Sequence, residues 1–163
     1  MIAVFVVQFW WFFACWTAIT LLVIAPWART RSPEAQLSMW IAPEMFRVLG
    51  LGLLVPTLSP GMPDEFAIST AIGDSVTATL ALTAFVALRR GHAAGRGLAW
   101  AVTVVGLADL LFAFPHALHT GAMPHLHAQY FVPVFCGPVM LLAHVMCLTT
   151  LVRTGRRRPA PMP

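Results

Sequence analysis

The stretch IAVFVVQFWWFFACWTAITLLVIA, residues 2–25, holds no charged side chain, and the first charge in the chain is Arg29. At a rise of about 1.5 Å per residue, a helix of this length crosses the roughly 30 Å hydrocarbon core of a bilayer. The stretch lacks the positive start of a signal peptide, and its apolar run is too long for one. Residues 2–25 therefore predict a retained transmembrane helix, with a cleaved signal peptide as the alternative.

Four further apolar stretches follow the first, at residues 37–58, 66–88, 97–118 and 128–152. The chain is 59% hydrophobic and only 10% charged, with a mean hydropathy of +0.80, whereas about 25% of the residues in an ordinary soluble domain are charged. The sequence therefore predicts an all-α bundle of five transmembrane helices. We expect one transmembrane domain over residues 1–152, with the lipid bilayer as its partner, and a basic, proline-rich tail over residues 153–163.

Arginines mark alternate loops between the predicted helices. They follow the first helix, separate the third from the fourth, and follow the fifth: Arg29, Arg31, Arg89, Arg90, Arg96, Arg153, Arg156, Arg157 and Arg158. The other two loops, residues 59–65 and 120–127, contain none. Because short cytoplasmic loops carry an excess of basic residues, all five helices indicate an N-terminus outside and a C-terminus in the cytoplasm. The expected location is a bacterial cytoplasmic (inner) membrane.

The composition excludes several classes of function. The chain contains no lysine, so a Schiff-base mechanism, including that of a retinal pigment, is excluded. The sequence pI of about 9.8 reflects arginines at helix ends, where membrane topology explains them, so nucleic acid is not an expected partner. The three cysteines lie inside apolar stretches, which argues against the disulfide framework of a secreted domain.

Four charged residues lie inside the predicted helices: Glu44 and Arg47 in the second, Asp74 in the third and Asp109 in the fourth. Each costs about 2.5 to 3.5 kcal/mol at a helix centre, so these residues should face the bundle interior and find partners. The helical rise places Asp74, Asp109 and Arg47 roughly 12, 13 and 16 Å from the outer boundary. We expect these three to form a polar site near the midplane, with Glu44 and His144 in a deeper second layer.

Small residues share a helix face with each aspartate, which predicts close approach of residues 66–88 and 97–118. The face of Asp74 carries Ala67, Ala71, Ala78 and Ala81, and the face of Asp109 carries Val102, Gly106, Ala113 and His116. One interpretation is a buried ion pair that only fixes helix packing. The other is a proton or ion relay, or an anion site at Arg47, because two aspartates and one arginine leave a spare carboxylate.

A histidine cluster, H-x2-H-x5-H-x-H, lies at the outer end of the fourth helix and in the loop after it. Its members are His116, His119, His125 and His127. Imidazole ligands suit Zn²⁺ or Cu²⁺, and His116 and His119 share a helix face if the helix continues through Pro115. The spacing matches no standard zinc pattern, so a polar, pH-sensitive loop is the alternative.

Met140, His144 and Cys147 lie on one stripe of the fifth helix. They could ligate copper(I) or supply an axial ligand to haem, but methionine and cysteine at helical spacing are usually packing residues. A bis-histidine haem is less favoured, because His116 and His144 differ in depth by roughly 20 Å.

The leading functional hypothesis is transport of a small solute, or a proton-coupled transport step, at the buried polar site. Five short helices hardly enclose a pathway alone, so the hypothesis includes a homo-oligomer or a larger membrane complex. The rival hypotheses are a membrane-embedded metal or haem oxidoreductase and a non-catalytic accessory or assembly subunit.

Overall fold

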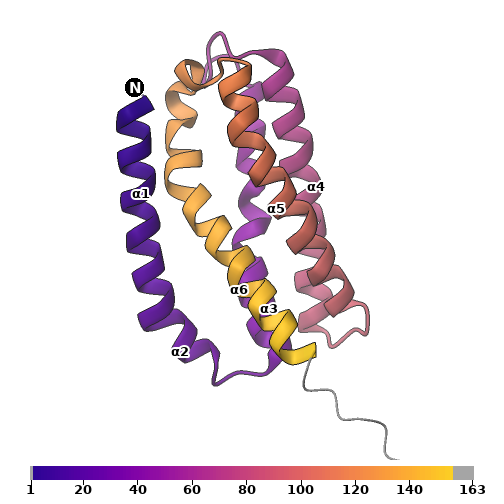
Figure 1. The fold of residues 1–163 in the computed structure, drawn as a ribbon. Coiled ribbons are helices and arrows are strands. Elements are labelled where there is room, and N and C mark those ends of the chain that lie inside the picture. Colours follow the sequence, from indigo (N-terminus) through magenta and orange to yellow (C-terminus); the bar gives the residue numbers. More distant parts are fainter. Residues whose placement is uncertain (1, 156–163) are drawn as a thin grey trace, which may run out of the picture.

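The computed structural model describes residues 2–155, and every regular element in that range is a helix (Figure 1). The elements are α1 (Ile2–Ile19), η1 (Thr20–Ile24), α2 (Ala25–Ala28), α3 (Pro33–Ile41), η2 (Ala42–Leu54), α4 (Asp64–Arg89), α5 (Gly95–His119), η3 (Met123–His125), η4 (His127–Tyr130), η5 (Val132–Cys136) and α6 (Gly137–Gly155). They join into five segments that are long and apolar enough to cross a membrane. The predicted all-helical fold with five membrane-length helices is confirmed.

The second segment runs over Pro33–Leu54 and not over the predicted residues 37–58. Its start is set by Ser32, whose hydroxyl accepts a hydrogen bond from the Ala35 amide at 3.3 Å, and by Pro33 in the first turn. Both residues are typical of a helix N-terminus. Hydropathy alone placed this boundary too late, because the first turn contains polar residues.

The predicted tail also begins later than expected. Arg153 belongs to α6, and its guanidinium donates a hydrogen bond to Gln36 Oε1 at 2.8 Å. Arg156, Arg157 and Arg158 lie outside the described residues.

α3 and η2 pack with α4, α5 and α6, while α1 stands to one side of them (Figure 1). The loops after α2 and α4 lie at the same end of the molecule as the end of α6. Hydrogen bonds tie this end together, including one from Arg96 to Thr154 Oγ1 at 2.6 Å. At the other end the Ala128 amide donates to the Leu58 carbonyl at 3.1 Å. The arginine-bearing loops therefore share one end of the bundle.

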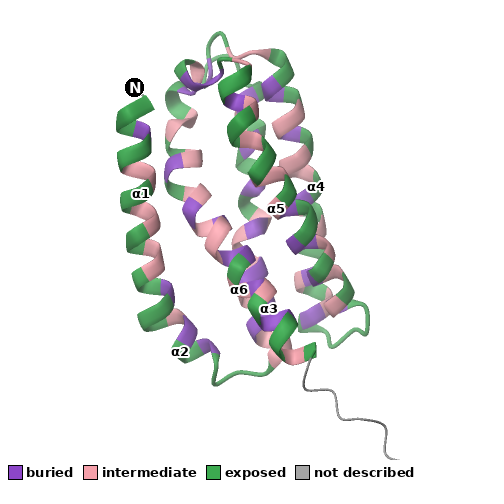
Figure 2. Cartoon of the chain, in the orientation of Figure 1, coloured by how far each residue is buried: buried purple, intermediate pink, exposed green. Residues whose placement is uncertain are grey.

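The outer surface of the helices is apolar, with exposed residues along all of them (Figure 2). Val7, Trp11 and Leu22 on the first segment are 68%, 70% and 77% exposed. Burying apolar area from water is worth roughly 25 cal/mol per Å², so a surface of this kind suits lipid and not water. The surface agrees with an integral membrane protein.

η2 is a 3-10 helix of 13 residues that begins at Ala42 and has Pro43 in its first turn. A 3-10 helix has about three residues per turn, so side chains three apart stack in one line. Glu44, Arg47, Gly50 and Leu53 follow this spacing, and all four are buried. The tight winding therefore turns every third residue of η2 toward the other helices.

Two clusters of buried apolar residues fill the two ends of the bundle. The cluster at the N-terminal end includes Phe5, Leu53, Phe66 and Met123. The cluster at the arginine-bearing end is larger and contains many small residues; its members are Ala25, Ala28, Leu37, Trp40, Ile41, Ala81, Ala84, Leu88, Ala99, Val102, Cys147 and Leu151. Alanines without exposed surface allow the helices to approach closely there.

Enlarging one of these alanines should therefore destabilise the fold. Ala99 has no exposed surface, so we expect Ala99→Leu to lower the free energy of unfolding by about 1–3 kcal/mol through overpacking. Ala108 lies on the same helix and is exposed, so Ala108→Leu should leave stability nearly unchanged. Denaturation in mixed micelles measures both variants, and equal losses would contradict this packing of α5.

Candidate functional site

Arg47 lies at the centre of the bundle and joins three helical segments. Its Nε donates a hydrogen bond to Asp74 Oδ1 on α4 at 2.7 Å, and its Nη2 donates to the Asp109 carboxylate on α5. Its Nη1 donates to the backbone carbonyl of Gly106 at 3.0 Å. The Arg47 side chain is only 2% exposed, so the guanidinium is held between two carboxylates away from the surface.

Glu44 and His144 extend this site toward α6. Glu44 Oε2 lies 3.9 Å from Arg47 Nη1 and 3.1 Å from His144 Nε2, and both the Glu44 and the His144 side chains are 1% exposed. The Glu44–His144 contact lacks hydrogen-bond geometry. Within residues 2–155 neither Glu44 carboxylate oxygen nor His144 Nε2 therefore has a hydrogen-bond partner. The five polar residues form a continuous chain of close contacts across four helical segments.

The charges of this cluster do not balance. Glu44, Asp74 and Asp109 supply three carboxyl groups, whereas Arg47 supplies one fixed positive charge and His144 a second only when protonated. Uncompensated charge in a membrane interior is costly. The cluster therefore needs at least one further proton or cation to become neutral, even with His144 protonated.

Three of the polar side chains of the site pack against a glycine of a neighbouring helix. The Asp74 carboxylate lies against Gly50, the Asp109 carboxylate against Gly73, and the His144 ring against Gly106. A Cβ atom built at Gly106 would lie 2.6 Å from both Cε1 and Nε2 of His144, and Cβ atoms at the other two would also overlap the carboxylates. The absence of side chains at these three positions creates the space that the polar groups fill.

The two apolar clusters lie on either side of the site along the bundle axis. In the second segment the site residues lie between Ile41 of one cluster and Leu53 of the other, and in α5 Asp109 lies between Val102 and Ala117. α4 repeats this order, whereas α6 carries members of only the cluster at the arginine-bearing end. From that end a ligand would have to pass a packed apolar layer to reach Arg47, while several residues of the other cluster line a cavity.

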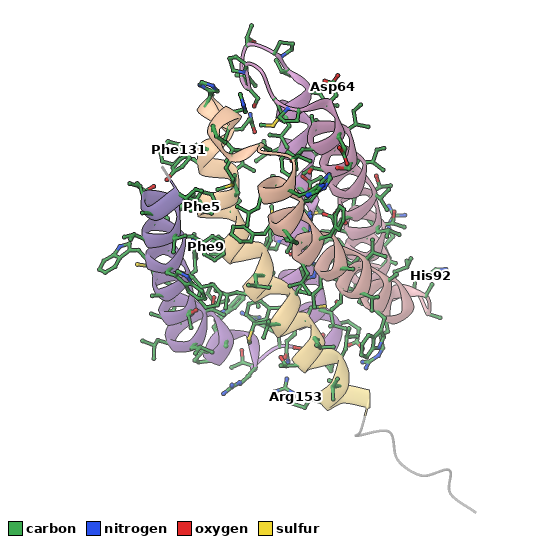
Figure 3. All side chains as sticks on the ribbon, turned by 45° about the horizontal axis from the view of Figure 1, so that its top comes forward. Phe5, Phe9, Asp64, His92, Phe131 and Arg153 are labelled. Atoms are coloured by element: carbon green, nitrogen blue, oxygen red, sulfur yellow. The ribbon has the colours of Figure 1, made fainter. Side chains whose placement is uncertain are left out.

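A cavity of about 480 Å³ reaches the site from the side, between α1 and the other helices. Arg47, Gly50 and Asp74 line it next to the site, and Phe5 and Phe9 project from α1 toward it (Figure 3). Its lining includes Trp10 on α1 and Leu111 on α5, which are 59% and 65% exposed. The mouth therefore lies between α1 and α5 on the apolar surface.

The four outer histidines do not form the expected metal site. Among residues 2–155 no group of three or more His, Cys, Asp or Glu side chains is arranged to hold a metal ion. α5 does continue through Pro115, but the His116 ring stacks on Phe112 with centroids 4.8 Å apart. His125 Nδ1 instead lies 3.3 Å from the Pro60 carbonyl. His119 and His127 do not complete a ligand set with them.

The stripe on the fifth helix is also divided among different environments. Met140 lines the cavity, His144 faces Glu44, and Cys147 is buried in the apolar cluster at the arginine-bearing end. These three residues therefore do not face one common ligand, as copper or haem would require.

Residues 4–152 match the family described as Domain of unknown function (DUF8737). The chain belongs to this family. The DUF8737 match includes every residue of the Arg47 cluster and both helices at the mouth of the cavity. No curated protein and no solved structure shows significant similarity to this DUF8737 chain.

Several residues of the DUF8737 site were missed by sequence reasoning. Gly50 and Gly73 were not singled out, although a glycine next to an aspartate inside an apolar stretch is a signal of close packing. The aromatic residues of α1 were not singled out either. Their role in the cavity depends on which face α1 turns inward, and an evenly apolar helix does not reveal that face.

The glycine contacts predict that alanine substitutions at two positions of α5 affect stability differently. We expect Gly106→Ala to destabilise the protein by about 1–3 kcal/mol, because the new methyl group displaces His144. Gly97→Ala is the matched control, since nothing lies within 4 Å of its Cβ position. Higher helix propensity should make Gly97→Ala neutral or stabilising. Unfolding in micelles measures both, and an equal or smaller loss for Gly106→Ala would contradict the contact.

Removing Arg47 should expose the charge imbalance. We expect Arg47→Gln to cost about 3–5 kcal/mol at neutral pH, because Asp74 and Asp109 lose their buried partner. The exposed Arg153 is the control, and Arg153→Gln should cost about 1 kcal/mol or less. Acidification should recover part of the Arg47→Gln loss, since protonated aspartates need no counter-charge. A loss that does not depend on pH would argue against this pairing.

Proposed function

We propose that this protein binds a small solute at the Arg47, Asp74 and Asp109 site and couples that binding to a proton, as a proton-coupled transporter does. The observation that carries the proposal is a surplus of buried carboxyl groups beside a cavity that reaches them. A site of this composition can exchange a proton for a bound ligand at little electrostatic cost.

The arrangement goes beyond what helix packing needs. A single carboxylate would neutralise Arg47, yet two aspartates bind it and Glu44 lies within 3.9 Å. Asp74 is 13% exposed and lines the cavity, while the arginine between the helices is 2% exposed. A purely structural ion pair has no need of a carboxylate that faces a cavity.

The proposal includes an orientation and an assembly. The arginine-bearing loops share one end of the bundle, so we place that end in the cytoplasm and the N-terminus outside, in a bacterial inner membrane. Five helices of this length hardly enclose a pathway across the membrane by themselves. We therefore propose that the working unit is a homo-oligomer or a larger membrane complex.

Infrared spectroscopy of the protein in lipid tests for the exchangeable proton. We expect a protonated carboxyl band that weakens as the pH rises, because carboxyl groups lose their protons in that direction. Asp74→Asn or Asp109→Asn should remove or shift this band. Asp64→Asn is the control, since Asp64 is exposed at the start of α4.

Two outcomes would contradict the proposed function. One is a carboxyl band in the infrared spectrum that does not change with pH. That result would indicate an ion cluster that only holds the helices together, as in an assembly or accessory subunit. The other is a pH-dependent band that persists unchanged in Asp74→Asn, in Asp109→Asn and in Glu44→Gln, because the exchangeable proton would then lie elsewhere.

A further inference from the structure

We propose that the ligand of this cavity is a lipophilic organic cation that enters from the bilayer and exchanges with a proton. This inference rests on the proposed proton-coupled site and names the chemical class of its ligand. Three independent features carry it: the charge of the site, the lining of the cavity and the position of the mouth.

The charge of the site favours a cation. Three carboxyl groups from η2, α4 and α5 face one arginine and one histidine from η2 and α6. One negative charge remains even with His144 protonated, so one proton or one monovalent cation makes the cluster neutral. An anion would add to the excess charge, and like charges at short range repel each other strongly in a low-dielectric interior.

The group that meets the ligand is a carboxylate. Asp74 and Arg47 both line the cavity, but the Asp74 side chain is 13% exposed and the Arg47 side chain only 2%. The Arg47 donors are directed to Asp74, Asp109 and the Gly106 carbonyl. Asp109 does not line the cavity. A cation in the cavity would therefore lie beside the Asp74 carboxylate, which is more exposed than the Arg47 guanidinium bonded to it.

The lining suits a bulky, apolar cation and not a hydrated metal ion. Phenyl rings of Phe5, Phe9, Phe66 and Phe114 surround the cavity, and aromatic faces attract organic cations that have little hydration to lose. The volume of about 480 Å³ lies within the range of sites for drug-sized molecules. An alkali ion would find a single carboxylate and several apolar rings there.

The mouth lies where a lipid-soluble ligand would arrive. A packed apolar cluster closes the site toward the arginine-bearing end, and Met123 and Leu126, which line the cavity toward the other end, are buried. The cavity opens between α1 and α5 beside the exposed residues Trp10 and Leu111. The exchange balances, because one monovalent cation enters as one proton leaves a carboxyl group of the cluster. The total charge of the occupied site is unchanged.

The closing experiment compares two ions of nearly equal size and shape and opposite charge. Labelled tetraphenylphosphonium and tetraphenylborate are titrated separately into purified full-length protein in neutral lipid nanodiscs, with empty nanodiscs as the background. We expect saturable binding of tetraphenylphosphonium with release of about one proton, and at least tenfold weaker binding of tetraphenylborate. Asp74→Asn should weaken phosphonium binding at least tenfold, whereas Asp64→Asn should not change it.

The outcomes separate this inference from the proposed function. Equal binding of the two ions, or phosphonium binding that Asp74→Asn leaves intact, overturns the cation site. If the pH-dependent carboxyl band is still present in that case, the proton site stands and only the ligand class is wrong. Should Asp74→Asn fail to fold, the comparison of the two ions on the unchanged protein still decides, because the binding of each ion is corrected for its own partition into empty nanodiscs. Saturable phosphonium binding without proton release overturns the exchange.

Discussion

The fold is organised around one buried guanidinium. Arg47 bonds to a carboxylate on α4, to another on α5 and to a backbone carbonyl of α5, so the positions of three helical segments depend on one side chain. A charge at this depth is tolerated only when its partners are in place. The helices must therefore dock together with these bonds formed, and the glycines opposite the polar groups provide the space that this docking needs.

The winding of η2 connects this constraint to the sequence. Its 3-10 spacing lines up Glu44, Arg47 and Gly50 on one face. An acidic side chain, a basic side chain and a glycine without a side chain therefore face the bundle in consecutive turns. Long 3-10 runs are uncommon and often mark a functional hinge. A small change in the winding of η2 would move Arg47 relative to Asp74 and Asp109. This gives the site a physical means of responding to the protonation of its carboxyl groups.

The apolar clusters and α1 divide the surroundings of the site into closed and open directions. One cluster packs against the site on the arginine-bearing side and the other lines the cavity, while α1 contributes a single buried side chain, Phe5. Aromatic rings next to a surplus of carboxyl groups are unusual in a protein interior, because a buried charge is normally paired with an opposite charge. Access from the side and this pairing together support a lipid-soluble ligand of positive charge.

The sequence by itself determined the five membrane-length helices and singled out Glu44, Arg47, Asp74, Asp109 and His144, because hydropathy and the cost of a charge in lipid act locally along the chain. Tertiary structure decided the rest. It brought the five residues into one cluster, separated the outer histidines that spacing had grouped, and formed the cavity beside α1. Contacts between helices depend on the rotation of each helix about its axis and on the winding of η2, and evenly apolar stretches leave both of these undetermined.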